Sequence, residues 1–138
     1  MYNFTNYIEW PADYKTGNFI IGVLGQNTTI AKDLRELAKM KKVHGQAIEV
    51  RTFNKESDIS NCHILYVPKS FASKIPVIES RIKGSTLLIS DTPGSISKGA
   101  AISFVESNGK LGYELQASNA EKHGLKLNSR LTALAVNK

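Results

Sequence analysis

A succession of two strand-like runs with a helical pattern between them fills residues 19–53 and constrains the fold more than any other feature. Residues 19–25 are continuously apolar, which is typical of a strand that is covered on both faces. Residues 30–37 then repeat apolar side chains at helical spacing, and Gly45 is expected to end that helix. Residues 47–53 indicate a second strand. The stretch therefore predicts a βαβ unit with parallel strands.

Two more strands and an interrupted helix are expected in the middle of the chain. Residues 64–67 and 86–90 form further apolar runs, and the helical stretch 71–82 lies between them. Pro76 should delay or break this helix, because proline lacks a backbone N–H and disfavours a helical conformation in the preceding residue. This alternation predicts a mostly parallel sheet.

The last third of the chain should add an antiparallel pair of strands. Residues 101–106 and 111–115 flank Asn108-Gly109, a dipeptide that readily adopts the positive φ angles of a two-residue hairpin turn. The predicted fold class is therefore α/β, a three-layer α/β/α sandwich with a mixed, mostly parallel sheet and a C-terminal β-hairpin. Two short helices should follow the hairpin, at residues 116–123, closed by Gly124, and around residues 131–135, capped by Asn128 or Ser129.

A helical pattern also opens the chain. Phe4, Tyr7 and Ile8 have the spacing of one helix face, and Pro11 should stop the helix, since proline biases Trp10 toward an extended conformation. Because the pattern begins almost at the first residue, we expect that a native N-terminal helix is truncated and that any signal peptide has been removed. Residues 1–138 are expected to form a single domain.

Charge and composition narrow the class of protein. The chain is 41% hydrophobic and 22% charged, with a net charge of +6, and its 18 basic residues are scattered among 12 acidic ones. The densest basic cluster, residues 39–44, is interpreted as the C-terminal end of a helix, where cations complement the helix dipole. No nucleic-acid-binding motif accompanies the charge, so nucleic acid is not an expected partner. The sequence contains no run of about 18 apolar residues, so it predicts no membrane span.

The only cysteine, Cys62, stands beside His63. Neighbouring residues of an extended segment point to opposite faces, so this pair is poorly placed to bind one metal or to act as nucleophile and base. We interpret Cys62 as a buried free thiol at the entrance of a strand. The glycines of residues 94–99 have P-loop separation, but Ala100-Ala101 replaces the required Lys and Ser/Thr and the segment leads into a strand. No catalytic residue, metal ligand or cofactor is predicted.

Polar residues follow three of the predicted parallel strands. Ligands of parallel α/β sheets usually bind at the carboxyl ends of the strands, so these residues are candidates for holding a small polar or anionic molecule. The alternative interpretation is that they cap helices and form turns. The candidate ligand-binding residues are Gln26, Asn27, Thr28, Lys69, Ser70, Asp91 and Thr92.

Six segments, taken in order, resemble the YfiR family over nearly the whole chain. Two departures stand out: Gly99-Ala100 occupies the place where a glycine pair often precedes the hairpin, and the extra cysteines that could form disulfides are absent. Disulfide-based redox control is therefore not expected. The matching segments are FTNYIEWP (4–11), FIIGVLG (19–25), NCHILYV (61–67), TLLISD (86–91), GAAISFVESNGKLGYEL (99–115) and HGLKLNSRLTALA (123–135).

The resemblance implies a small periplasmic protein, exported to that compartment, that binds and restrains an inner-membrane diguanylate cyclase and so controls cyclic-di-GMP signalling and biofilm formation. It implies no catalytic residue and is compatible with a homodimer. Two alternatives stay open: a periplasmic small-ligand binding module that feeds a sensor kinase, and an uncharacterised enzyme that uses the strand-end residues.

Overall fold

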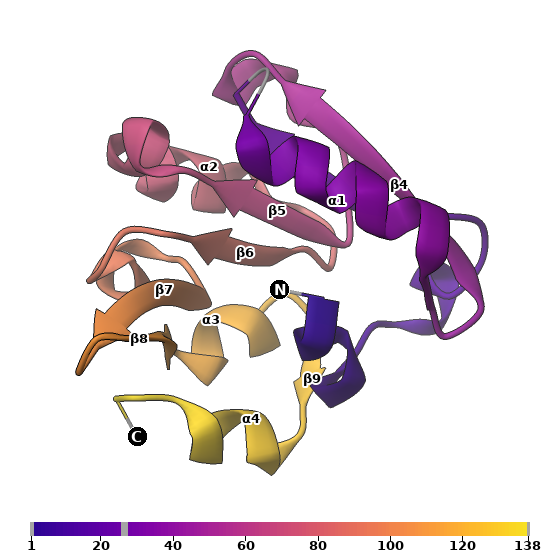
Figure 1. Ribbon diagram of the computed structural model, residues 1–138. Helices are drawn as coiled ribbons and strands as arrows, with labels where there is room; N and C mark the ends of the chain where they lie inside the picture. Colours follow the sequence, from indigo (N-terminus) through magenta and orange to yellow (C-terminus); the bar gives the residue numbers. More distant parts are fainter. Residues whose placement is uncertain (1, 26–27, 138) are drawn as a thin grey trace.

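A seven-stranded mixed sheet forms the centre of the molecule in this computed structural model, which describes residues 2–25 and 28–137 (Figure 1). The strand order is β3-β4-β2-β5-β6-β7-β8, and the neighbours from β4 to β7 are parallel. The outer strands β3 and β8 pair antiparallel. The bounds are β2 Phe19–Leu24, β3 Lys42–Val43, β4 Gln46–Phe53, β5 Ile64–Val67, β6 Leu87–Ser90, β7 Ile102–Ser107 and β8 Lys110–Leu115.

A second, two-stranded sheet ties the beginning of the chain to its end. Strand β1 (Ile8–Glu9) pairs antiparallel with β9 (Lys126–Leu127). The α-helices are α1 Thr29–Met40, α2 Ile75–Arg81, α3 Ala117–Glu121 and α4 Ser129–Leu134. The 3₁₀ helices are η1 Tyr2–Tyr7, η2 Ala12–Tyr14, η3 Glu56–Asp58, η4 Lys69–Lys74 and η5 Ser95–Lys98. Within the described ranges, no helix combines the length and apolarity that crossing a membrane requires.

Side chains of the central strands alternate between two hydrophobic clusters. One cluster, which we call the α1 face, includes the buried side chains of α1 and, from β2, Phe19, Ile21 and Val23. Leu24 joins a second cluster, with Ile75 of α2, which we call the α2 face. Both faces of the central strands are therefore covered, as continuous apolar runs predict. The sheet is mixed and curled, as an α/β fold allows. Its arrangement as a regular three-layer sandwich stays a prediction.

Several local predictions are confirmed. Strands β2 and β4 flank α1 and pair in parallel, as a βαβ unit requires. Thr28 caps α1, since its hydroxyl accepts a hydrogen bond from the Ala31 N–H at 3.1 Å. Pro76 lies in the first turn of α2, and the residues before that helix form the 3₁₀ helix η4 instead of an earlier α-helical turn. Asn128 caps α4 by accepting from Arg130 N–H at 2.8 Å.

Two predictions are wrong in detail. The opening segment is a 3₁₀ helix that ends at Tyr7, and Ile8 lies in β1; a 3₁₀ helix repeats every three residues, so it also places Phe4 and Tyr7 on one side. Gly45 does not end α1, which stops at Met40. Instead His44 and Gly45, with φ of 48° and 86°, form the turn between β3 and β4.

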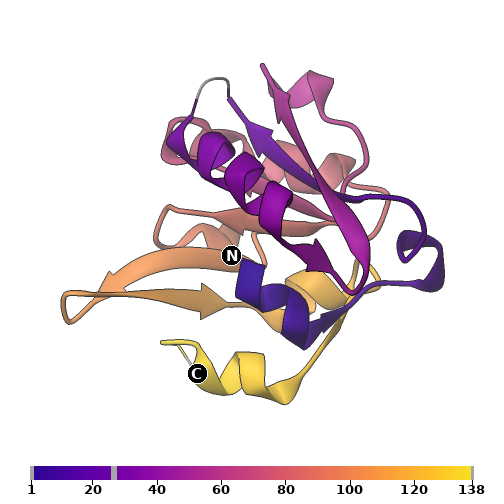
Figure 2. The ribbon, with the colours of Figure 1, turned by 45° about the vertical axis from the view of Figure 1, so that its right-hand side comes forward.

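The C-terminal segment covers the outer edge of β8. Strands β7 and β8 are joined through Asn108 and Gly109, whose φ angles are 53° and 75°. Beneath them runs the end of the chain (Figure 2), where Val136 N–H donates to Tyr113 O at 2.9 Å. The side-chain amide of Asn137 bonds both backbone groups of Leu115, at 2.9 and 3.1 Å. The tail thus protects an edge strand that would otherwise present unpaired backbone groups.

Candidate functional site

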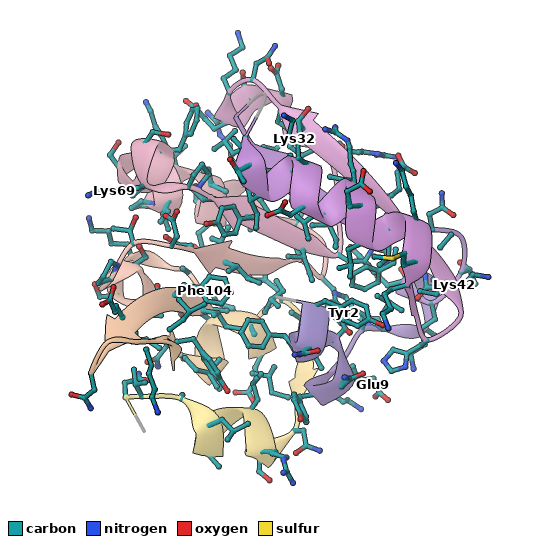
Figure 3. The ribbon with its side chains drawn as sticks, in the orientation of Figure 1. Tyr2, Glu9, Lys32, Lys42, Lys69 and Phe104 are labelled. Carbon is teal, nitrogen blue, oxygen red and sulfur yellow. The ribbon has the colours of Figure 1, made fainter. Side chains whose placement is uncertain are left out.

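The candidate residues at the strand ends lie along one edge of the sheet. Thr28 follows β2, Lys69 and Ser70 follow β5, and Asp91 and Thr92 follow β6. Strands β2, β5 and β6 are parallel neighbours, so their carboxyl ends share that edge. Lys69 projects from the surface there (Figure 3). Two further predicted residues, Gln26 and Asn27, lie outside the described residues.

The contacts at this edge are mainly those of caps and turns. Asp91 accepts a hydrogen bond from Tyr66 Oη at 2.9 Å, which links β5 to the end of β6. Burial and this carboxylate raise the pKa of Tyr66. Thr92 donates its N–H to Ser90 Oγ at 3.0 Å and its hydroxyl to Asp91 Oδ1 at 3.4 Å. None of these residues lines the cavities described below, so ligand binding at this edge stays a prediction.

Aromatic rings gather at the opposite edge, where the parallel strands begin. The His63 ring lies 4.4 Å from Phe19, 5.2 Å from Tyr14 and 6.0 Å from Trp10, measured between centroids. Trp10 and Phe19 meet edge to face at 5.1 Å, and Trp10 Nε1 donates to the His63 carbonyl at 3.1 Å. This arrangement explains why the segment around Trp10 returns to the sheet beside the start of β5.

His63 is held as one neutral tautomer by two backbone groups. Its Nδ1 accepts from the Ile20 N–H at 3.1 Å, and its Nε2 lies 2.6 Å from the Tyr14 carbonyl. A carbonyl oxygen can only accept, so Nε2 carries the proton. Burial lowers the pKa of His63, opposed by the hydrogen bond to Tyr14. Both ring nitrogens are thus used in joining three segments of the backbone.

Cys62 belongs to the other face of the sheet. It packs in the α2-face cluster and is 2% exposed. Burial raises the pKa of the thiol to about 12, so it is protonated at neutral pH and a poor nucleophile. The prediction that Cys62 and His63 face opposite sides is therefore confirmed. In the described part of the chain, no three His, Cys, Asp or Glu side chains cluster as a metal site requires.

Two cavities flank this Cys-His pair, one on each face. The first measures about 590 Å³ and lies among η1, β1, β9 and the turn before β4; its floor includes Ile8, Trp10, Phe19, Val43 and His63, and its rim Glu9, Lys15 and Lys126. The second, which we call the α2 cavity, measures about 490 Å³. Its lining comprises Glu56, Ser57, Ile59, Ser60, Asn61, Cys62, Leu65, Ile78, Arg81, Ile82, Lys83, Gly84 and Thr86.

Both cavities were missed by reasoning from the sequence, which looked at the carboxyl ends of the strands. The available signal was the concentration of Trp10, Phe19 and His63 near predicted strand starts. That signal is ambiguous, because aromatic residues in such positions equally indicate a packed core.

The fold and its sites define a small mixed α/β domain with a buried, structural Cys-His pair between two cavities. A family model described as YfiR/HmsC-like matches residues 1–136. The chain therefore belongs to the YfiR/HmsC-like family, as the resemblance of its six segments implied. A comparison with curated proteins gave no match.

Proposed function

We propose that this protein is a periplasmic regulator that binds and restrains an inner-membrane diguanylate cyclase, and so limits cyclic-di-GMP and biofilm formation. The observation that carries the proposal is the family match over nearly the whole chain. The regulator acts by stoichiometric binding: it prefers the inactive state of the cyclase, and the ratio of its affinities for the two states sets the extent of repression.

The roles of Cys62 and His63 are compatible with a regulator that has no catalytic step. The thiol has a raised pKa, and the imidazole uses both nitrogens in backbone hydrogen bonds. Neither side chain needs a role beyond holding the fold together. The partner surface must then be sought on the outside, where Leu111, Leu134 and Val136 are exposed large apolar residues of the C-terminal third.

Capture from native membranes tests the proposal. The purified protein serves as bait for detergent-solubilised inner membranes, and mass spectrometry identifies what is retained. We expect one membrane-anchored diguanylate cyclase, whose cyclic-di-GMP synthesis falls as the protein is added. Recovery of a sensor kinase would favour the ligand-module alternative, and a folded bait that retains neither would contradict the proposal.

A further inference from the structure

We propose that the α2 cavity is a binding site for a small amphipathic carboxylate, with the apolar body inside the cavity and the carboxylate on Arg81. This site goes beyond the proposed regulation and does not depend on it. Its volume of about 490 Å³ falls within the usual range of small-molecule sites, roughly 300–1,000 Å³.

The floor of the α2 cavity suits an apolar body. Cys62, Leu65 and Ile78 are each at most 2% exposed, and Ile59 and Ile82 are partly buried against the same cluster. The polar side chain at the floor already has a hydrogen-bond partner, since the Thr86 hydroxyl donates to the Cys62 carbonyl at 2.6 Å. A polar ligand body would lose its hydration here without gaining partners, whereas an apolar body would gain contacts.

The rim of the cavity carries an excess of positive charge. Arg81 and Lys83 line it together with one acid, Glu56. The Glu56 carboxylate lies 3.7 Å from Lys74 Nζ, so a further cation already faces it. An anionic headgroup is therefore favoured over a cationic one at this rim.

Arg81 is the group best suited to hold a carboxylate. It is the last residue of α2 and is exposed. Its positive charge is the smallest of the causes that lower the pKa of the Glu56 carboxyl. None of the described residues forms a hydrogen bond to the Arg81 guanidinium. The planar guanidinium can donate two parallel hydrogen bonds to one carboxylate, a geometry that a lysine does not offer. Ser57, Ser60 and Asn61 complete the polar rim.

Decanoate, kept below its micelle concentration, is a direct probe. Calorimetry and thermal unfolding are compared for decanoate, decanol and decyltrimethylammonium. We expect saturable binding of decanoate that raises the Tm, with clearly weaker binding of the neutral and cationic chains. Arg81→Gln should weaken decanoate binding about tenfold or more, on the scale of one lost charge-assisted pair.

Arg35→Gln is the matched control, because Arg35 is an exposed arginine of α1, outside the cavity. It should leave decanoate binding unchanged. A second readout is the rate at which Cys62, on the cavity floor, reacts with an aromatic disulfide; decanoate should slow this reaction in the wild type and much less in Arg81→Gln. The proposal is overturned if decanoate does not bind, if the cationic chain binds as well, or if both arginine variants respond alike.

Discussion

At the scale of single residues, His63 joins three backbone segments through a neutral ring, so its contacts depend on pH. Its Nδ1 needs the lone pair for the Ile20 N–H and its Nε2–H serves the Tyr14 carbonyl, so protonation would place a second N–H against the Ile20 donor. His63 is also only 5% exposed as a residue, and burial disfavours the charged form of its ring. Because the pKa of His63 is lowered in the folded protein, the free energy of unfolding depends on pH.

We predict that stability falls as the pH drops below about 6.5, the ordinary pKa of histidine. The unfolded chain takes up a proton there while folded His63 does not, so the free energy of unfolding falls toward the lowered pKa, by at most about 1.4 kcal/mol per pH unit. His63→Gln should lower stability at pH 7.5 but remove this part of the slope between pH 7.5 and 5.5. Urea unfolding at the two pH values measures both changes.

Gly22 owes its identity to the packing of the α2 face. A Cβ at this position of β2 would stand 2.8 Å from Phe53 Cε2 and 3.2 Å from Cys62 Sγ. Gly22→Ala should therefore lower the free energy of unfolding by about 1–3 kcal/mol through overpacking, as denaturant titration would record. Phe53→Leu in the same chain should recover part of that loss. Equal stability of Gly22→Ala and wild type would show that the face repacks freely.

At the scale of elements, the longer strands and α1 could be predicted from the pattern of apolar residues along the chain. Strands β2 and β5 are continuous apolar runs, and α1 repeats apolar residues on one face, so each carries its own signal. Strands β1, β3 and β9 have two residues each, too few to show a period. They exist because tertiary contacts hold them: Tyr2 Oη, for example, donates to the carbonyl of Lys42, the first residue of β3, at 2.9 Å. Both residues are labelled in Figure 3.

The candidate site was harder to predict than the fold for a related reason. The strand-end residues Thr28 and Asp91 were recognisable from chain order, but the same polar types serve caps and turns, and that is where their contacts go. The α2 cavity combines residues of η3, β5 and α2 with the loop before β6. Which of these meet depends on how far α2 extends before Ile82 turns away, a distance that no local pattern specifies.

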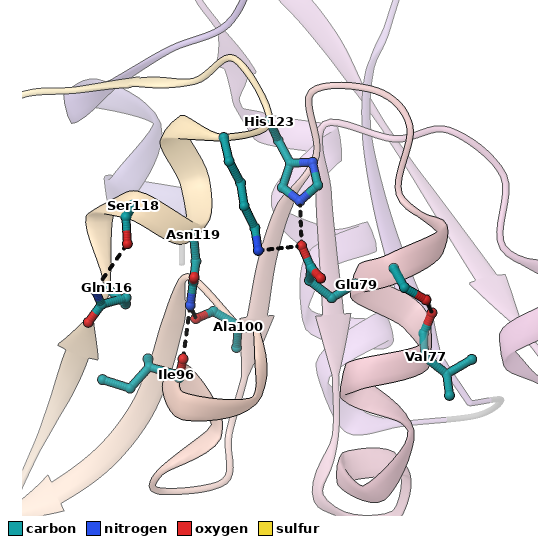
Figure 4. Close-up of polar contacts among 10 residues, drawn as sticks. Val77, Glu79, Ile96, Ala100, Gln116, Ser118, Asn119 and His123 are labelled. Carbon is teal, nitrogen blue, oxygen red and sulfur yellow. Dashed lines mark hydrogen bonds and ion pairs between the residues drawn. The ribbon is translucent and has the colours of Figure 1, made fainter.

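Glu79 connects α2 to the residues that directly follow α3 in one ion-pair cluster (Figure 4). Its Oε1 lies 2.7 Å from Lys122 Nζ and 3.1 Å from His123 Nε2, and its stem covers Gly99, where a Cβ would meet Glu79 Cγ at 2.8 Å. The hydrogen bond from Lys122 is the main reason why the pKa of Glu79 is lowered. The cluster therefore contributes stability above the ordinary carboxyl pKa and loses it as the pH falls through the lowered one.

We predict that Glu79→Gln reduces the free energy of unfolding by up to about 1 kcal/mol at pH 7, since the pair is only partly buried. The difference between variant and wild type should shrink below about pH 4.5, because the unfolded wild-type chain takes up a proton on this carboxylate there while folded Glu79 stays ionised down to its lowered pKa. Glu36→Gln is the control, because Glu36 and Lys39 pair at 3.1 Å with both side chains about 70% exposed. A Glu79→Gln effect that does not change with pH would point to lost packing over Gly99 instead of lost charge.

At the scale of the whole molecule, two strongly exposed apolar side chains mark two candidate surfaces for partner binding. Met40 ends α1 and is 75% exposed, whereas Leu111 is the second residue of β8 and is 79% exposed. The tail covers the backbone edge of β8 at Tyr113 and Leu115, so Leu111 stands at the end of the strand that this tail does not cover. A membrane partner that packs on the hairpin would bury it.

We therefore predict that Leu111→Glu weakens capture of the membrane partner about tenfold or more, because a carboxylate at the interface would be desolvated. Met40→Glu, a change of the same kind at a similarly exposed position, should leave capture unchanged. Both variants should unfold at the wild-type temperature, since neither side chain is buried. Binding of the solubilised partner to immobilised variants gives the comparison, and loss of capture in Met40→Glu with retention in Leu111→Glu would move the interface to the exposed C-terminal end of α1.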